Sequence, residues 1–254
     1  MSDAVLVDVT DGIMTITLNR PKARNAINGD AARGLAAAMD QLDGDDDIRV
    51  AILTGAEGTF CSGMDLKGFL TGDLPSVEGR GFGGLTESLP SKPLIGAIEG
   101  YALAGGCELA LCCDMLIMAE NAKFGIPEVK RGLVAAAGGL VRLPRQIPQR
   151  IAMELALTGD FFSAQRAAEI GLVNHVVPEG TALAAAKELA AKINANGPLA
   201  VRLSKKIVTE SAEWSGAEMF DKQNAIAMPV FSSEDAIEGA AAFAEKRAPN
   251  WKGK

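Results

Sequence analysis

Histidine and closely spaced cysteines are scarce in this sequence, and their scarcity excludes several kinds of site. His175 is the only histidine, and it lies in an extended apolar stretch that favours a structural position. The four cysteines include no C-x-x-C pair, the spacing that thiolate metal sites usually need together with histidine. No G-x-S-x-G or Walker motif occurs, so any catalysis must rely on carboxylates or backbone dipoles. We expect no metal site, and buried free thiols in a reducing compartment at Cys61, Cys107, Cys112 and Cys113.

An excess of positive charge and long apolar runs are also lacking. The formal net charge is −7, from 25 basic and 32 acidic side chains, so we expect no nucleic-acid binding. The longest apolar run, 102–113, contains Glu108 and is too short to span a membrane. The N-terminus shows neither the basic nor the apolar segment of a signal peptide. The sequence therefore predicts a cytoplasmic protein that is not in a membrane.

One glycine-rich stretch has the spacing of a dinucleotide-binding loop but not its surroundings. Gly79 to Gly84 fits G-x-G-x-x-G, yet Pro75-Ser76-Val77-Glu78 stands where a hydrophobic strand is required. We interpret residues 68–84 as a flexible or functional loop, because long loops in compact domains usually have one of these roles. No redox cofactor is expected.

The 254 residues contain alternating strand and helix patterns followed by helical patterns alone. Two short strand patterns flank Asp11-Gly12, a hairpin turn signal, and a helical face runs from Asp30 to Leu42. Strand–turn–helix units continue through the first two thirds, with an extended stretch at 172–177. The fold class predicted is α/β, with a core at 1–197 and a helical C-terminal region at 198–254.

Two glutamates stand in unusual surroundings. Glu108 has almost only small or apolar neighbours, which predicts burial and a pKa raised toward neutrality, as a general acid or base needs. A structural alternative is a first-turn helix glutamate stabilised by the helix dipole. Glu128 follows Pro127, which fits the first position of a short helix, and it could equally be a solvated turn glutamate. Each residue by itself is open to both interpretations.

Two glycine-containing turns change the balance between these interpretations. Gly105-Gly106 lets the backbone approach a ligand closely at a helix N-terminus. The stretch Phe60 to Leu66 is a second turn between a strand end and a helix. Backbone N–H groups from two such turns can together bind a developing oxyanion.

Four sequence blocks resemble the crotonase, or enoyl-CoA hydratase, superfamily over nearly the whole chain. Each block is loose alone, but their order and spacing together are specific. The blocks are Asn19-Arg20-Pro21-Lys22-Ala23-Arg24-Asn25-Ala26, Phe60-Cys61-Ser62-Gly63-Met64-Asp65-Leu66-Lys67, Gly100 to Ala110, and Phe124-Gly125-Ile126-Pro127-Glu128 followed by Gly138-Gly139 and Arg142-Leu143-Pro144.

The resemblance implies a fold, an assembly and a reaction. The fold is a crotonase-like spiral of repeated ββα units whose C-terminal helical region serves trimerisation, giving a homotrimer or a dimer of trimers. The thioester carbonyl would be held by the backbone N–H groups of Met64 and Gly105. Retention of both Glu108 and Glu128 favours enoyl-CoA hydration, in which the pair activates water for C3 and exchanges a proton at C2. Coenzyme A is then part of the substrate, and no separate cofactor is implied.

The resemblance also implies which residues contact the acyl-CoA thioester. Lys22 and Arg24 are the local positive contacts for the anionic coenzyme A, although a solvated basic loop is the alternative for both. The remaining substrate-binding candidates are Ala26, Ser62, Asp65, Leu66, Gly106 and Pro127.

The sequence departs from the hydratase pattern at two places. Ile126 stands where many hydratases have glutamine, which removes a possible hydrogen-bond partner for Glu108. Ala135-Ala136-Ala137 stands where relatives often have Pro-Gly-Ala. Both changes bear on the water geometry.

Three rival functions remain open. Residues 233–239, 243–247 and 251–253 resemble carnitinyl-CoA dehydratase, and Phe69, Asp73, Phe82 and Glu87 could wall a trimethylammonium group. An enoyl-CoA isomerase and a non-catalytic acyl-CoA-binding protein are the other two.

Overall fold

The structure, a computed structural model, describes residues 3–254 except the side chain of Phe69. Its largest element is a six-stranded sheet of order β1-β2-β3-β6-β8-β11. β1 runs antiparallel to β2, and every other neighbouring pair is parallel. Asp11 and Gly12 in the β1–β2 turn both have positive φ, so the predicted hairpin is confirmed. The strands are β1 (Val5–Thr10), β2 (Ile13–Leu18), β3 (Val50–Gly55), β6 (Leu94–Ile98), β8 (Met115–Ala119) and β11 (His175–Val177).

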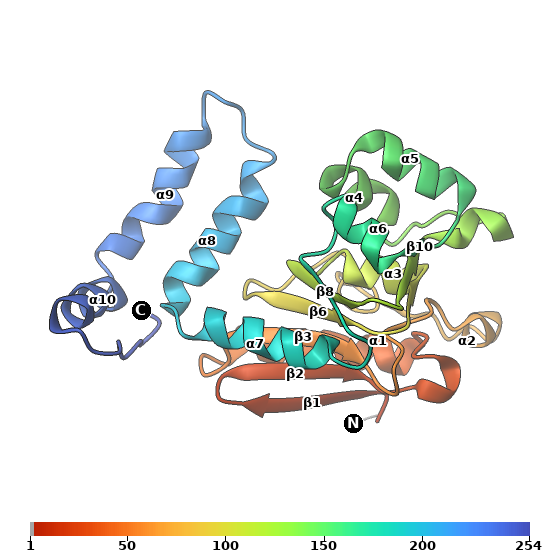
Figure 1. The fold of residues 1–254 in the computed structure, drawn as a ribbon, viewed down its shortest axis with the longest axis horizontal. Coiled ribbons are helices and arrows are strands. Elements are labelled where there is room, and N and C mark those ends of the chain that lie inside the picture. The colour runs from red at the N-terminus through yellow and green to blue at the C-terminus, as the bar shows by residue number, and fades with distance from the viewer. Residues whose placement is uncertain (1–2) are drawn as a thin grey trace.

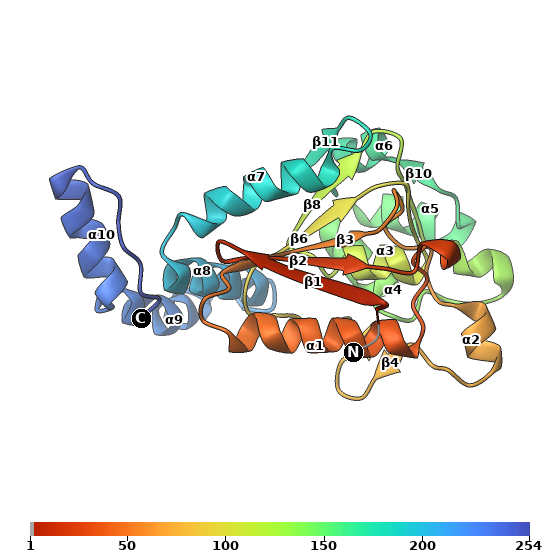
Figure 2. The same cartoon turned by 90° about the horizontal axis from the view of Figure 1, so that it is seen from below.

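Alternate residues of the central strands pack into two different apolar layers. Ala51 and Leu53 of β3 join a core with the buried face of α1 (Gly29–Gly44), while Val50 and Ile52 pack against α7 (Ala182–Asn194). This two-residue alternation places one helix on each face of the sheet. Figure 2 shows α7 and α1 on opposite sides of the strands.

A smaller sheet of order β10-β9-β7 lies beside the large one. β7 and β9 are parallel, and β10 is antiparallel to β9. Short helices follow these strands and cluster around their ends (Figure 1). The elements are β7 (Tyr101–Leu103), α3 (Gly105–Ala110), β9 (Lys123–Gly125), η2 (Pro127–Arg131), α4 (Gly139–Gln146), α5 (Gln149–Thr158), β10 (Phe162–Ser163) and α6 (Ala164–Glu169).

The predicted loop at 68–84 contains regular structure of its own. It begins within α2 (Leu66–Leu70) and continues into a two-stranded hairpin of β4 (Ser76–Val77) and β5 (Gly81–Phe82). Of the G-x-G-x-x-G glycines, Gly79 lies in the turn of this hairpin, Gly81 in β5 and Gly84 just after it, so the motif is not a strand-to-helix connection.

The C-terminal helices project away from the sheet, as Figure 1 shows. α8 (Pro198–Ser211) and α9 (Met219–Phe231) pack together as a hairpin, and α10 (Glu234–Glu245) follows. The tail then returns, because Trp251 Nε1 donates to the Ala195 carbonyl and the Asp235 carboxylate accepts from the N–H groups of Lys252 and Gly253. The predicted domain boundary coincides with the start of α8. The division into two domains stays a prediction.

Two predicted elements are shorter in the structure. The apolar helical pattern that begins at Gly105-Gly106 predicts a helix to about Cys112, but α3 ends at Ala110, because Cys112 and Cys113 donate to carbonyls three residues back and tighten the last turn. The extended stretch at 172–177 forms a strand only from His175, since Leu172 still donates to Ala167 O behind α6. Among the described residues, no helix has both the length and the apolarity to cross a membrane.

Candidate functional site

Two neighbouring parallel strands bring the glutamates to one edge. β7 pairs with β9 so that Leu103 lies opposite Gly125, and the Ala104 N–H donates to Gly125 O over 2.8 Å. α3, which carries Glu108, follows β7, and η2, which carries Glu128, follows β9. Since the carboxyl ends of parallel strands lie at the same edge, the two segments emerge side by side.

Glu108 is buried, and its carboxyl accepts backbone hydrogen bonds. Only 3% of Glu108 is exposed to solvent. Its Oε1 accepts a hydrogen bond from the Gly139 N–H over 2.8 Å. Burial raises the pKa of Glu108 to about 7, and the negative charge of Glu128 adds to this rise. Hydrogen bonds from the N–H groups of Gly139 and Ala137, and then the positive charge of Arg142, oppose it. Glu108 therefore changes protonation near neutral pH, as the sequence predicted.

Glu128 is half-buried and carries an unused acceptor. It lies in the first turn of η2 directly after Pro127. Its Oε2 is buried, and no donor in the described part of the chain hydrogen-bonds to it. Burial raises its pKa, although the charge of Arg131 opposes the rise. A buried acceptor without a partner is costly, so this oxygen is suited to receive a water or substrate proton.

The two glycine-containing turns touch each other. Gly63 has a φ of +107°, and a Cβ built on it would lie 2.9 Å from Ala104 Cβ and 3.3 Å from Gly105 N. Ala104 itself has a φ of +51°, a strained conformation for a residue with a side chain. Within the described residues, the N–H groups of Met64 and Gly105 donate no hydrogen bond. Two free backbone donors thus come from turns in direct contact.

The glycine pair after Ala104 is required by close packing. A Cβ on Gly106 would lie 2.1 Å from the Cys61 carbonyl oxygen, where no side chain fits. A Cβ on Gly105 would lie 2.4 Å from Phe82 Cζ, so the Phe82 ring rests directly on this glycine. Phe82 is therefore a wall beside the free Gly105 N–H. The sequence suggested Phe82 as a possible wall for a trimethylammonium group, not as a neighbour of Gly105.

Backbone hydrogen bonds join the first sequence block to the second. Ile27 N donates to Gly63 O and Asp65 N donates to Ile27 O, over 2.8 and 2.9 Å. Ser62 N donates to Arg24 O. The predicted contact residues thus lie where these two segments are joined. Lys22, Arg24 and Leu66 are exposed, Ser62 is half-buried, and Ala26 is buried.

The carboxylate of Asp65 stabilises the turn before α2. It forms an ion pair with Arg20 at 2.8 Å and accepts the N–H groups of Lys67 and Gly68 at the start of α2. The hydrogen bond from Arg20 is the main cause that lowers the pKa of Asp65. This carboxylate is therefore committed to holding the turn.

The two departures from the hydratase pattern have different consequences. Ile126 is buried in the apolar core at 2% exposure and offers Glu108 no hydrogen bond. The Gly139 N–H, reached after the Ala135–Ala137 stretch, supplies one instead. All four cysteines are free and buried, as predicted, and His175 is exposed on β11.

Sequence reasoning missed the role of two residues near Glu108. Gly139 was noted only as part of a glycine pair, and Arg142 only as part of Arg-Leu-Pro. Their sequence signal lay in the fourth block, but a pattern does not show which atom meets which. Of the residues proposed to wall a cationic head group, Phe82 lies at Gly105 and Asp73 accepts the Gly29 N–H. The side chain of Phe69 lies outside the described residues.

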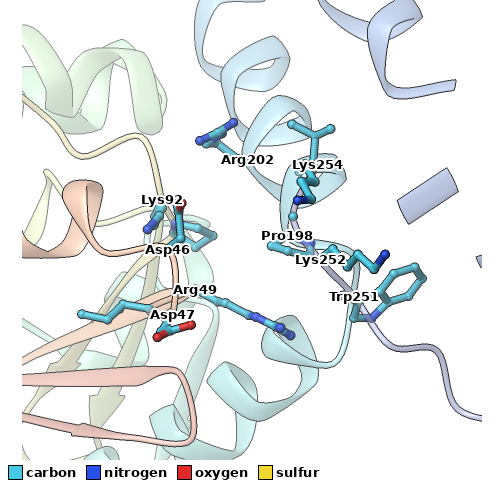
Figure 3. Close-up of a pocket in the computed structure, with 13 residues that line it drawn as sticks. Asp46, Asp47, Arg49, Lys92, Pro198, Arg202, Trp251, Lys252 and Lys254 are labelled. Atoms are coloured by element: carbon cyan, nitrogen blue, oxygen red, sulfur yellow. The ribbon is translucent and has the colours of Figure 1, made fainter. Parts of the chain in front are cut away.

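A charged cavity of about 210 Å³ lies elsewhere in the molecule. Its walls precede β3 and β6, whereas Glu108 lies beyond the carboxyl ends of β7 and β9. Figure 3 shows Arg49 and Lys92 of the core facing the start of α8 and the C-terminal tail. This cavity is separate from the glutamate pair.

Comparison with known proteins agrees with this geometry. A sequence profile of the enoyl-CoA hydratase/isomerase family matches residues 8–254. The enoyl-CoA hydratase EchA19 of Mycobacterium tuberculosis is 45% identical over 97% of this chain and 95% of its own length. The carnitinyl-CoA dehydratase of Proteus mirabilis is 40% identical over the full length of both chains.

Solved structures show the same fold. An enoyl-CoA hydratase from Mycobacterium tuberculosis superposes with a TM-score of 0.98 at 61% identity, covering 100% of both chains. A carnitinyl-CoA hydratase from Mycobacterium avium superposes with a TM-score of 0.80 at 40% identity, again over 100% of both chains. The predicted α/β crotonase-like fold is confirmed, and this chain belongs to the enoyl-CoA hydratase/isomerase family.

Proposed function

We propose that this chain is a hydro-lyase, an enoyl-CoA hydratase that reversibly adds water across the 2,3 double bond of an enoyl-CoA thioester. One observation carries the proposal: Glu108 and Glu128 emerge from neighbouring strand ends, and Glu108 has a pKa of about 7. A pair in which one carboxyl is protonated and the other ionised can give and take a proton in the same reaction.

The proton balance of hydration needs both carboxyls. The ionised member accepts a proton from water while the water oxygen forms its bond to C3. The protonated member gives its proton to C2. The pair gains one proton and loses one, so no external acid or base is consumed, and dehydration is the same sequence reversed.

The thioester oxygen gains negative charge as the C3–O bond forms. The free N–H groups of Met64 and Gly105 are suited to donate hydrogen bonds to this oxygen, because their two turns are in contact and neither donor is used within the described chain. Donors already in place stabilise such charge without reorganising, which typically lowers a barrier by about 3 kcal/mol for each donor. The tight packing at Gly63 and Gly106 supports the fixed geometry this role requires.

The coenzyme A part is proposed to lie where the first and second sequence blocks are joined by backbone hydrogen bonds. Lys22 and Arg24 are exposed there and would meet its phosphates, while Ala26, Ser62, Asp65 and Leu66 would line the channel. The Asp65 carboxylate would shape the turn rather than touch the ligand, since Arg20 and two N–H groups occupy it. Gly106 and Pro127 would complete the wall by their buried backbone.

A second candidate is the hydration of crotonobetainyl-CoA, the reverse of carnitinyl-CoA dehydration. It is supported by the 40% identity to carnitinyl-CoA dehydratase over the full chain. The same glutamate pair would perform both reactions, so the two candidates differ only in the acyl head group.

The assembly is proposed to be a homotrimer or a dimer of trimers. α8, α9 and α10 expose the large apolar side chains Val208, Phe220, Phe231 and Phe243, which are between 63% and 88% exposed. Apolar faces of this extent usually mark an interface between proteins. Sedimentation at several concentrations tests this, and a monomer throughout would contradict it.

A substrate panel tests the proposed function. We expect loss of the enoyl-thioester absorbance with crotonyl-CoA, and a comparison with longer enoyl-CoAs and crotonobetainyl-CoA ranks the acyl groups. A 3-enoyl-CoA included in the panel detects isomerase activity. Bound CoA without turnover of any thioester would contradict the hydratase proposal and favour a non-catalytic binding protein.

A further inference from the structure

Arg142 reaches from α4 to two separate segments that border the glutamate pair. Its Nη2 donates to the Thr86 carbonyl oxygen, one turn beyond Phe82. Its Nη1 donates to the Ala137 carbonyl oxygen over 3.5 Å, just before the glycine that binds Glu108. One guanidinium thus bridges the segment that covers Gly105 and the segment that holds Glu108.

The chain leaves room for this bridge at Gly138. Gly138 has a φ of +107°, and a Cβ built on it would lie 2.0 Å from Arg142 Nη1. A side chain at this position would displace the guanidinium. The backbone is therefore shaped so that Arg142 lies flat against the turn that presents the Gly139 N–H.

The charge of Arg142 also acts on Glu108. It opposes the effect of burial on the pKa of Glu108, and in the same way it opposes the rise that burial causes in the pKa of the Cys112 thiol. The other ionisable groups of this region are Glu128 on η2, the thiol of Cys107 on α3, the thiol of Cys112 just beyond α3, and Arg131, which acts on Glu128. Arg142 is the cation that acts on Glu108 itself.

We propose that Arg142 is a positioning residue for Glu108, acting through the Ala137–Gly139 turn and through its positive charge. The effect of Arg142 on the reaction rate rests on the proposed hydration reaction. Its effect on Glu108 itself does not depend on which reaction the site performs. A guanidinium fits because two nitrogens of its rigid planar fork each donate to a different carbonyl, whereas the three donors of an ammonium group all belong to one nitrogen.

The first experiment measures the ionisation of Glu108 directly. ¹³C-labelled glutamate in the full chain gives the titration of each carboxyl, and Glu108→Gln identifies the resonance of Glu108. We expect Arg142→Met to raise the pKa of Glu108 by about half a unit or more, because removing a nearby cation disfavours the ionised carboxylate. Arg142→Lys keeps the charge and should show a smaller rise.

Arg145→Met is the matched control. Arg145 lies on the same helix, but its ion pair with Glu213 is exposed on both sides, at 71% and 68%. This variant should leave the titration of Glu108 unchanged. A shift of equal size in both variants would assign the effect to α4 as a whole and would overturn the proposal.

The second experiment separates positioning from binding. With crotonyl-CoA, Arg142→Met should lower kcat by about tenfold or more and change KM by less than about threefold, because misplacing a reacting group affects the transition state more than binding. The rise of the pKa should also move the corresponding limb of the pH–rate profile to higher pH. Arg142→Lys should recover part of kcat.

The outcomes distinguish this inference from the proposed function. If the wild-type chain hydrates no thioester but Arg142→Met still raises the pKa of Glu108, the positioning role stands and the function fails. If folded Arg142→Met keeps both the wild-type pKa and the wild-type kcat, the positioning role is wrong. Circular dichroism checks folding, and if Arg142→Met does not fold, Arg142→Lys is judged by the same two measurements.

Discussion

The backbone N–H of Gly139 donates to Oε1 of Glu108 over 2.8 Å, and this bond fixes one end of the candidate catalytic pair. The two residues lie on different helices and are brought together only by the packing of α4 against α3. The bond stabilises the ionised carboxylate, whereas burial and the charge of Glu128 favour the protonated one. Burial prevails, so Glu108 changes its charge near neutral pH. A kinetic and a stability prediction follow for this glutamate.

Glu108→Gln and Glu128→Gln should each lower kcat for crotonyl-CoA by about a hundredfold or more, since a neutral amide cannot exchange the proton. Both amides are close in size to the carboxyls they replace, so circular dichroism should show an unchanged fold. Stopped-flow or steady-state absorbance measures the rate. Wild-type turnover in either variant would remove that residue from the mechanism.

The stability of Glu108→Gln should depend on pH. The folded pKa of Glu108 is about 7 against an ordinary 4.5, so the folded state binds this proton more tightly than the unfolded state. The stability contributed by the proton is full below pH 4.5 and is lost as pH rises through 7. Glutamine stays neutral, so its excess stability over wild type should grow toward alkaline pH, reaching at most about 3 kcal/mol. Thermal unfolding at pH 5 and pH 8 measures it, and an equal difference at both would contradict the raised pKa.

Gly63→Ala should separate the two turns that carry the free N–H groups. Its Cβ would meet Ala104 Cβ at 2.9 Å and Leu103 O at 3.1 Å, so the turn must move. We expect kcat to fall by about tenfold to a thousandfold, the range seen when an oxyanion donor is lost. Gly58→Ala is the control, because Gly58 also has positive φ but a Cβ there would meet nothing within 4 Å. Equal losses in both would indicate backbone strain alone.

Lys22→Ala and Arg24→Ala should weaken binding of coenzyme A thioesters. Each exposed cation typically contributes up to about 1 kcal/mol, so KM should rise about threefold to fivefold for each change, and less at high salt. A crotonyl thioester of N-acetylcysteamine lacks the coenzyme A phosphates and should show no rise. Lys187→Ala, at an exposed site on α7, is the control. A rise of equal size with the short thioester would place these residues outside the phosphate site.

Local signals in the sequence were sufficient for most elements of the fold. The hairpin at Asp11-Gly12 follows from residues that tolerate positive φ, and α1 follows from its apolar face and from Asn28, whose side chain caps Ala31 N. α8, α9 and α10 lie within the predicted helical region at 198–254. Element ends were less predictable at Cys112 and Leu172, because hydrogen bonds to neighbouring turns decide them.

The resemblance of four sequence blocks determined the family and the fold class and favoured Glu108 and Glu128 as the pair, and the apolar neighbours of Glu108 by themselves predicted its burial and raised pKa. Only the tertiary structure decided the contacts of those glutamates. Gly139 and Arg142 meet the site through helix packing, and Phe82 covers Gly105 through a distant hairpin. These contacts join residues that are far apart in the chain. A sequence pattern does not show which side chains meet in the packed interior, because that depends on how the helices and strands pack.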